Sequence, residues 1–228
     1  MNMISSLFSR FDPSSSIVFT SNWFSLIIIS SFIPITFWFI PNFNYLIFKK
    51  IKFLLFHEIK ILTNLDLFKG APIIFFSLFI FILLNNFMGL FPFIFTATSH
   101  IITTFTLALP LWLSFMLIGW INFTNSIFSH LVPQGTPSAL ISFIVIIETI
   151  SNIIRPGTLA VRLSANIIAG HLLLTLLGNL TASSSQFILF SLIIAQITLL
   201  ILESAVAIIQ AYVFIVLTSL YLSESSPH

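Results

Sequence analysis

The sequence contains no cysteine and few charged residues, which make up 6% of the 228 residues. Without cysteine, disulfides, thiolate metal sites and cysteine nucleophiles are excluded. About a quarter of the residues of an ordinary soluble domain are charged, so this chain is not one. The net charge of +2 is too small to indicate nucleic-acid binding. No Gly-rich phosphate loop of the Walker type is present, and we expect neither a catalytic site for ATP nor a bound cofactor or metal.

Hydrophobic residues make up 58% of the chain, and the mean hydropathy is +1.14. A helix of about 20 apolar residues crosses the hydrocarbon core of a bilayer. This composition predicts an all-α integral membrane protein that forms a single domain. We expect about five transmembrane helices, over residues 17–40, 71–95, 100–123, 138–177 and 185–223.

Residues 44–69 differ from these spans, because polar and basic residues gather on one side of a predicted helix. A basic amphipathic helix of this kind lies in the membrane interface. All five lysines of the chain are in this segment, so the positive-inside rule places it on the matrix or cytoplasmic face. The N-terminus is then expected on the opposite side and the C-terminus on the lysine side. Lipid headgroups are a second expected contact of these lysines: Lys49, Lys50, Lys52, Lys60 and Lys69.

The last two apolar segments are longer than a membrane span requires. Residues 138–177 are interrupted only at Pro156-Gly157, and residues 185–223 contain neither glycine nor proline. A helix of the latter length is about 58 Å long, almost twice the thickness of the hydrocarbon core. We therefore expect two steeply tilted helices, joined by a turn at residues 178–184 into a hairpin that could curve around another cylindrical object.

Arg162 is a permanent positive charge within an apolar segment, with no acidic residue nearby in sequence. Such a charge at the centre of a membrane helix costs about 2.5 to 3.5 kcal/mol on insertion scales, which makes it a candidate functional residue. Small residues flank it at Ala165 and Ala169, so a partner helix could approach closely. At 100° per residue, four polar residues share its stripe: Glu148, Ser151, Arg155 and Asn166.

A second polar stripe is predicted on the last helix, where Gln196, Glu203 and Gln210 recur every seven residues. His171 lies nearly opposite Arg162 around the first long helix and about 13 Å further along it, and Glu148 lies about 21 Å the other way. Titratable groups at separate depths in a membrane are typical of proton relays. Arg162 cannot release a proton, so a fixed electrostatic gate is its natural role.

Each of these residues also has a purely structural interpretation. Arg162 could pair with Glu203, and Gln210 could form an ordinary interhelical hydrogen bond. Glu148 could cap a helix start, and His171 could be a packed histidine. Arg155 is interpreted as an auxiliary charge near a water-filled cavity.

Other classes of membrane protein fit the sequence less well. A cytochrome b subunit needs paired histidines about four turns apart, whereas the first four histidines here are 43, 30 and 41 residues apart. An antiporter-like respiratory subunit would carry lysines at mid-membrane, and a plain anchor would not retain Arg162, Glu203 and Glu148 in its spans. A proton-translocating subunit of another respiratory complex stays the alternative.

One stretch carries a family resemblance, IETISNIIRPGTLAVRLSANIIAGHLL at residues 147–173. It resembles the signature of subunit a of the F-type rotary ATP synthase in its mitochondrial form. Two further segments are similar to that family, LESAVAIIQAYVF at residues 202–214 and LNNFMGLFP at residues 84–92. The first 70 residues resemble it only in general layout.

The resemblance implies a stator subunit of the mitochondrial inner membrane, packed against a rotating ring of c subunits. Peripheral-stalk and small membrane-sector subunits would be further partners. Arg162 would separate two proton half-channels and hold the ring carboxylate in its ionised form. Glu203 and His171 would line the access from the intermembrane space, and Glu148 the exit to the matrix. Asn166 and Gln210 would be polar neighbours of the arginine, with Arg155 and Gln196 as additional candidates for the pathway.

Overall fold

The computed structural model describes residues 11–13, 22–30, 42–62, 70–91, 94–122, 124, 140–183 and 185–224. The described ranges are helical and contain no strand, which confirms the all-α fold class. Four helices are long and apolar enough to cross a membrane, namely Ala71–Gly89, Ile101–Asn122, Ile141–Thr181 and Gln186–Ser223. The expected span at 17–40 lies largely outside the described residues. Its described part forms the short helices η2 (Asn22–Phe24) and α2 (Ser25–Ser30).

Helix α3 (Phe43–Leu62) is amphipathic, as predicted for residues 44–69, and the rest of that segment lies outside the described residues. Leu55 and Ile59, one turn apart, are buried in the hydrophobic core. Lys49, Lys50 and Lys60 are exposed. Lys52 lies over the ring of Phe76 in α4, 5.7 Å from its centroid, so the basic side of α3 also contacts the protein. The position of α3 in the membrane interface stays a prediction.

Helix α4 (Ala71–Gly89) begins with Pro72 in its first turn, a position that needs no backbone N–H. We predicted that it reaches residue 95, but it ends at Gly89. A Cβ atom at Gly89 would lie 2.8 Å from Cγ2 of Thr96, so the chain folds back closely onto this glycine. After the turn, η3 (Ala97–Ser99) leads into α5 (Ile101–Asn122), close to the predicted 100–123.

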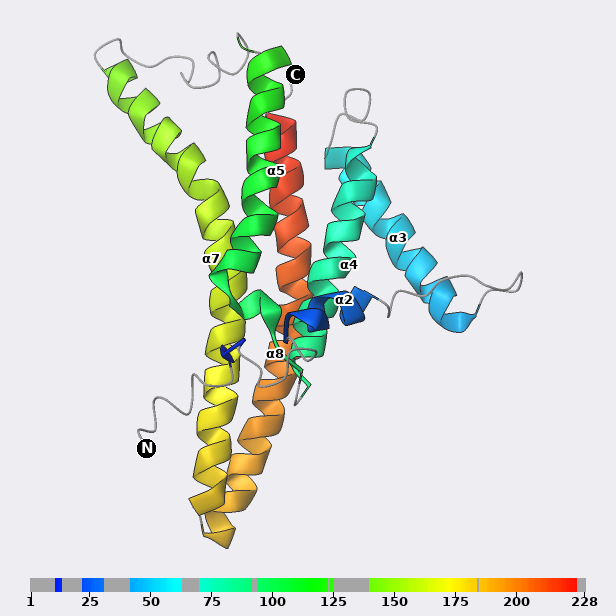
Figure 1. The fold of residues 1–228 in the computed structure, drawn as a ribbon, viewed down its shortest axis with the longest axis vertical. Helices are drawn as coiled ribbons and strands as arrows, with labels where there is room; N and C mark the ends of the chain where they lie inside the picture. The colour runs from blue at the N-terminus through cyan, green and yellow to red at the C-terminus, as the bar shows by residue number, and fades with distance from the viewer. Residues whose placement is uncertain are drawn as a thin grey trace.

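Helix α7 (Ile141–Ser183) runs without a break through Pro156-Gly157, as expected for a single long helix whose apolar pattern alone is interrupted there. Thr158 Oγ1 donates to the Arg155 carbonyl at 3.0 Å beside the proline. The first part of α7 diverges from α5 in Figure 1.

The reversal between the two long helices is shorter than predicted. Gly178 lies inside α7, and its carbonyl accepts a hydrogen bond from Thr181 Oγ1 at 2.7 Å. Helix α8 (Gln186–Glu224) begins at once after residues 184–185. The predicted boundaries 138–177 and 185–223 are therefore corrected to 141–183 and 186–224, because a glycine inside a helix costs only about 1 kcal/mol relative to alanine and does not by itself end the helix.

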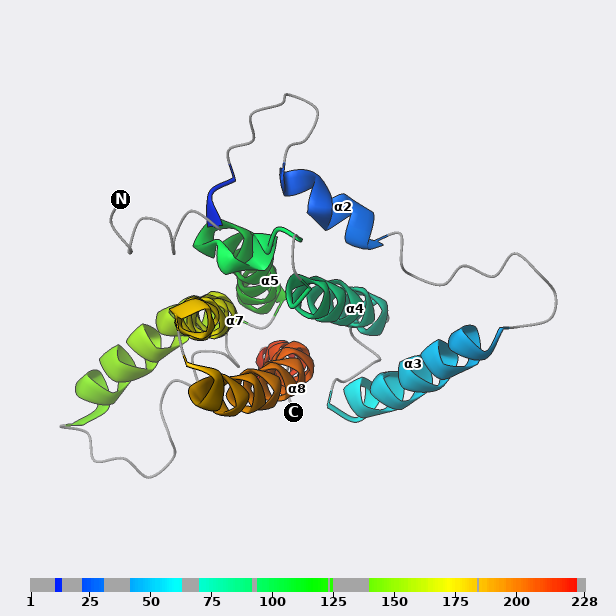
Figure 2. The same cartoon turned by 90° about the horizontal axis from the view of Figure 1, so that it is seen from below.

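Helices α7 and α8 form the predicted hairpin, and α4 and α5 pack on one of its faces (Figures 1 and 2). Helix α4 packs mainly on α8, and α5 mainly on α7. Small residues, Ala160 and Ala211, are fully buried in the core between these helices. The opposite face of the hairpin, which we call the open face, includes exposed residues of both helices: Arg162, Ala165, Ala169, Leu202 and Ile209.

Several helix ends gather at one end of the molecule. The C-terminal ends of α3, α5 and α8 and the N-terminal ends of α4 and α7 all lie at the upper end of Figure 1. The turn between α7 and α8 lies at the lower end, and the start of α5 lies between. The lysine-bearing α3 thus ends at the same end of the molecule as α8, and the side of the membrane that this end faces stays a prediction.

Candidate functional site

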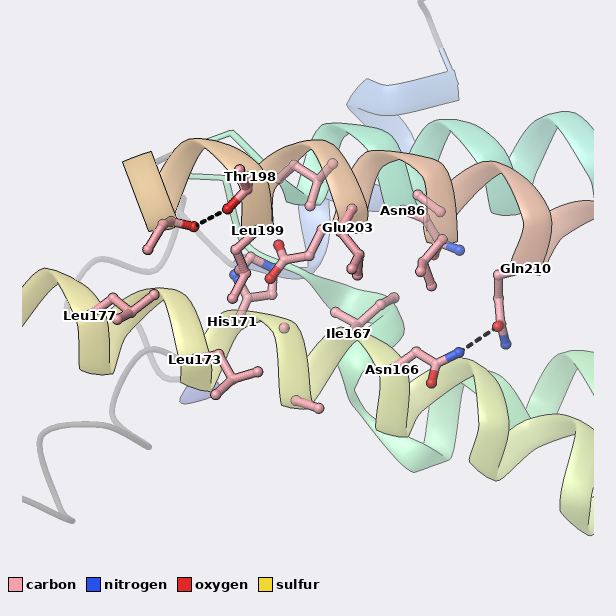
Figure 3. Close-up of a pocket in the computed structure, with 17 residues that line it drawn as sticks. Asn86, Asn166, Ile167, His171, Leu173, Leu177, Thr198, Leu199, Glu203 and Gln210 are labelled. Carbon is pink, nitrogen blue, oxygen red and sulfur yellow. Dashed lines mark hydrogen bonds between the residues drawn. The ribbon is translucent and has the colours of Figure 1, made fainter. Parts of the chain in front are cut away.

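The two predicted polar stripes meet at Asn166 and Gln210. Asn166 Nδ2 of α7 donates to Gln210 Oε1 of α8 at 2.7 Å (Figure 3). Gln210 is buried. At the far end, a Cβ atom on Gly178 would lie 4.0 Å from Gln196 Nε2, so Gln196 also faces α7. This line of residues between α7 and α8, from Gln196 to Gln210, is here called the polar seam.

Glu203 lies in the polar seam directly against Gly170. A Cβ atom at position 170 would lie 2.6 Å from Glu203 Oε1 and 2.8 Å from Cδ. A larger residue at this place in α7 would require the carboxylate to move. Both carboxylate oxygens are buried, and no described residue forms a hydrogen bond with either of them. A buried polar group without a protein partner points to water or a transferable proton at the site.

A cavity of about 520 Å³ surrounds this carboxylate (Figure 3). His171, which is buried, lines it beside Glu203, and most of the remaining wall is apolar. The polar lining residues come from three helices, α4, α7 and α8: Asn86, Asn166, His171, Thr198, Glu203 and Gln210. The structure thus brings four of the predicted site residues together in one cavity.

Asn86 of α4 is a lining residue that the sequence reasoning missed. Its Nδ2 and Oδ1 are both buried and have no hydrogen-bond partner in the described part of the chain. An uncharged amide in an apolar helix gives only a weak signal. The Asn85-Asn86 pair was visible in the sequence, but only the packing shows that Asn86 reaches the cavity whereas Asn85 bonds its own helix, at the Phe81 carbonyl.

Arg162 lies outside this cavity, on the open face of the hairpin, and is exposed. Within the described ranges, no hydrogen bond or ion pair joins its guanidinium to another residue. The structural alternative of a pair between Arg162 and Glu203 is therefore wrong for this conformation. Asn166, one turn further along α7, lines the cavity and bonds Gln210 there.

Glu148 and Arg155 form a second polar group, nearer the N-terminal end of α7. Arg155 Nη2 lies 3.7 Å from Glu148 Oε1, two turns away on the predicted stripe. The guanidinium also lies over the ring of Tyr221 in α8, 5.1 Å from its centroid. The two side chains are partly exposed, at 25% for Arg155 and 41% for Glu148. Tyr221 was not foreseen, because only the packing of α7 on α8 brings it there.

Comparison with known proteins decides the family. The profile described as "ATP synthase A chain" matches residues 58–223. The chain belongs to the ATP synthase A chain family. It is 58% identical to ATP synthase subunit a of Locusta migratoria over 223 residues, which cover 97% of this chain and 99% of the relative. It is 57% identical to ATP synthase subunit a of Drosophila melanogaster and of Anopheles gambiae, with the same coverage.

Family membership and the four apolar helices make this chain a multi-pass, proton-translocating stator subunit of the ATP synthase membrane sector. All eight predicted site residues lie within the part matched by the ATP synthase A chain profile. The first 57 residues lie outside that profile, although the insect relatives align with nearly the whole chain. The resemblance read from residues 147–173 is thereby confirmed at the level of the family.

Proposed function

We propose that this chain carries protons through two half-channels that Arg162 keeps apart, in the mitochondrial inner membrane. The observation that supports this most directly is the position of the arginine. It is exposed and without an ion pair in the described ranges, whereas Glu203 and His171 lie together in the cavity nearby. A cation that cannot release a proton repels hydrated protons and attracts an ionised carboxylate.

The cavity around Glu203 is proposed as the half-channel that opens to the intermembrane space. Its carboxylate oxygens have no partner among the described residues, so a proton can reach them without the breaking of an internal bond. His171 and Asn86 supply further polar groups along the same apolar wall. Water between them would complete a chain of hydrogen bonds, since the cavity has room for many water molecules.

Glu148 and Arg155 are proposed to line the exit to the matrix. They lie nearer the start of α7 than His171 does, and α7 begins at the end of the molecule where the lysine-bearing α3 ends. Their partial exposure agrees with a water-filled opening. In this orientation the N-terminus faces the intermembrane space and the C-terminus faces the matrix.

The open face of the hairpin is proposed to meet the ring of c subunits. Small side chains next to Arg162 let a ring helix approach, and the missing counter-charge is then the ring carboxylate. One proton crossing 100 mV releases about 2.3 kcal/mol. That energy is of the order of the cost of a single charge in a membrane helix, so each transfer can bias rotation. Peripheral-stalk subunits, small membrane-sector subunits and lipids are the other proposed partners.

Replacement of Arg162 by Ala tests the gate. In the reconstituted complex we expect proton-driven ATP synthesis to stop and passive proton permeability to rise, because the two half-channels are no longer separated. Val161→Ala, on the next residue and also exposed, is the matched control and should keep coupled synthesis. Normal coupled synthesis in Arg162→Ala would disprove the gate.

The inlet is tested by Glu203→Gln, which removes the titratable group but keeps the shape of the side chain. We expect proton flux through the membrane sector to fall strongly. A Glu203→Gln complex with full proton flux at all pH values would remove Glu203 from the proposed pathway.

A further inference from the structure

A short N-terminal segment, residues 11–13, lies against the side of His171. The rings of Phe11 and His171 meet edge to face, with centroids 6.2 Å apart and planes at 78°. Figure 2 shows this segment on the α5 side of α7, away from the open face. His171 lines the cavity, whereas Phe11 is not among the described residues that do so. The histidine is thus placed between the cavity and the N-terminal segment.

The N-terminal segment is fixed to the connection between α4 and α5. Asn22 Nδ2 donates to the Asp12 carbonyl at 3.4 Å. The ring of Trp23 packs on Phe95 and on His100, at centroid distances of 5.9 Å and 5.4 Å. Ser25 Oγ, two residues later, donates to the Phe95 carbonyl at 3.2 Å. The position of Phe11 beside His171 therefore has structural support from contacts outside α7.

An imidazole passes a proton along a fixed path only if its ring is held in one orientation. An edge-to-face aromatic contact contributes about 0.5–1.5 kcal/mol and depends strongly on geometry, so it disfavours other orientations of the ring. Phe11 offers no polar atom, so it blocks its side of the imidazole without competing for the proton. His171 is only 4% exposed in this arrangement.

We propose that Phe11 is a positioning residue for His171. Its ring holds the imidazole in one orientation beside Glu203 and covers the side of the histidine that faces away from the cavity. The proposal rests on the proposed role of His171 in proton entry. It assigns a function to a segment that lies outside the residues matched by the family profile.

The accessibility of the His171 imidazole is measured with diethylpyrocarbonate, a reagent that carbethoxylates accessible histidine nitrogens. The intact complex in membrane vesicles is treated with the reagent, and the rate at His171 is read by mass spectrometry relative to exposed His57. We expect Phe11→Ala to raise the relative rate at His171 several-fold and to lower proton-driven ATP synthesis. Phe11→Tyr retains the ring edge and should restore both values.

Phe24→Ala is the matched control, since Phe24 is an aromatic residue of the same N-terminal region but is 55% exposed. It should leave the rate at His171 unchanged. An unchanged rate in Phe11→Ala, or an equal rise in Phe24→Ala, overturns the proposal. If Phe11→Ala fails to assemble, Phe11→Leu replaces it, with the same expected rise and the same outcomes against it. The Arg162→Ala experiment is independent of all these variants, so the proposed function can stand where this inference fails.

Discussion

Gly170→Ala is the sharpest test of the inlet geometry, because it adds one methyl group at the place where the Glu203 side chain of α8 lies against α7. The new Cβ atom would lie 2.6 Å from Glu203 Oε1, whereas ordinary contact begins at 3.4 Å. The carboxylate therefore has to move by about 0.8 Å, the difference between these distances. It can do so, because it is the end of a flexible side chain, and we expect the fold to persist.

The displacement is large enough to matter for proton transfer. Misplacement of a reacting group by about 1 Å can reduce a rate by about 100-fold. We expect Gly170→Ala to reduce proton-driven ATP synthesis by roughly tenfold to 100-fold. Loss of helix stability cannot explain such a result, since alanine favours a helix over glycine by about 1 kcal/mol.

The assay is proton-driven ATP synthesis in vesicles, normalised to the amount of assembled complex. Gly157→Ala is the matched control, because Gly157 is also in α7 and a Cβ atom there would meet nothing within 4 Å. The control should retain full synthesis. Equal activity of the two variants would refute the view that the position of the Glu203 carboxylate limits proton entry.

Two further contacts give testable predictions. The hydrogen bond between Asn166 and Gln210 is tested by a double-mutant cycle in which each residue is replaced by alanine and the thermal stability of the complex is measured. We expect a coupling free energy of about 0.6 kcal/mol, and at most about 1.7 kcal/mol. Single effects that simply add would contradict this prediction. Tyr221→Leu removes the cation–π contact with Arg155, worth about 1 kcal/mol, and should lower ATP synthesis a few-fold. Arg155→Gln should lower ATP synthesis to a similar extent. Activity that stays normal in both of these variants would show that the Glu148 pair is not part of the exit.

The parts of the site that could be predicted from the sequence are those set by the periodicity of a single helix. The 100° spacing along α7 put Glu148 and Arg155 on one stripe, and they form an ion pair. The seven-residue repeat along α8 put Gln210 on the face that meets α7. The opposed positions of Arg162 and His171 were also correct, since one is exposed and the other buried. Residues of a single helix are predictable because helix geometry is rigid.

Contacts between helices were not predictable in the same way. Asn86 and Tyr221 reach the two polar groups only because of how α4 and α8 pack against α7. Gly170 looked like a neutral helix residue until its closeness to Glu203 was seen. The predicted C-terminal ends of α4 and α7 were wrong because a glycine ends a helix in one context and continues it in another. Helix α4 ends at Gly89, where the chain folds back, whereas α7 continues through Gly178.

The sequence by itself determined the membrane class, the long hairpin and the candidate residues for a proton pathway, because apolar length and helical period are local properties. It also marked Arg162 as a charge without a partner in the chain. The tertiary structure decided which of these residues share a cavity and which lie on the open face. That decision depends on close packing between distant segments, in which Gly170 leaves space for the Glu203 side chain and the ring of Phe11 lies against His171.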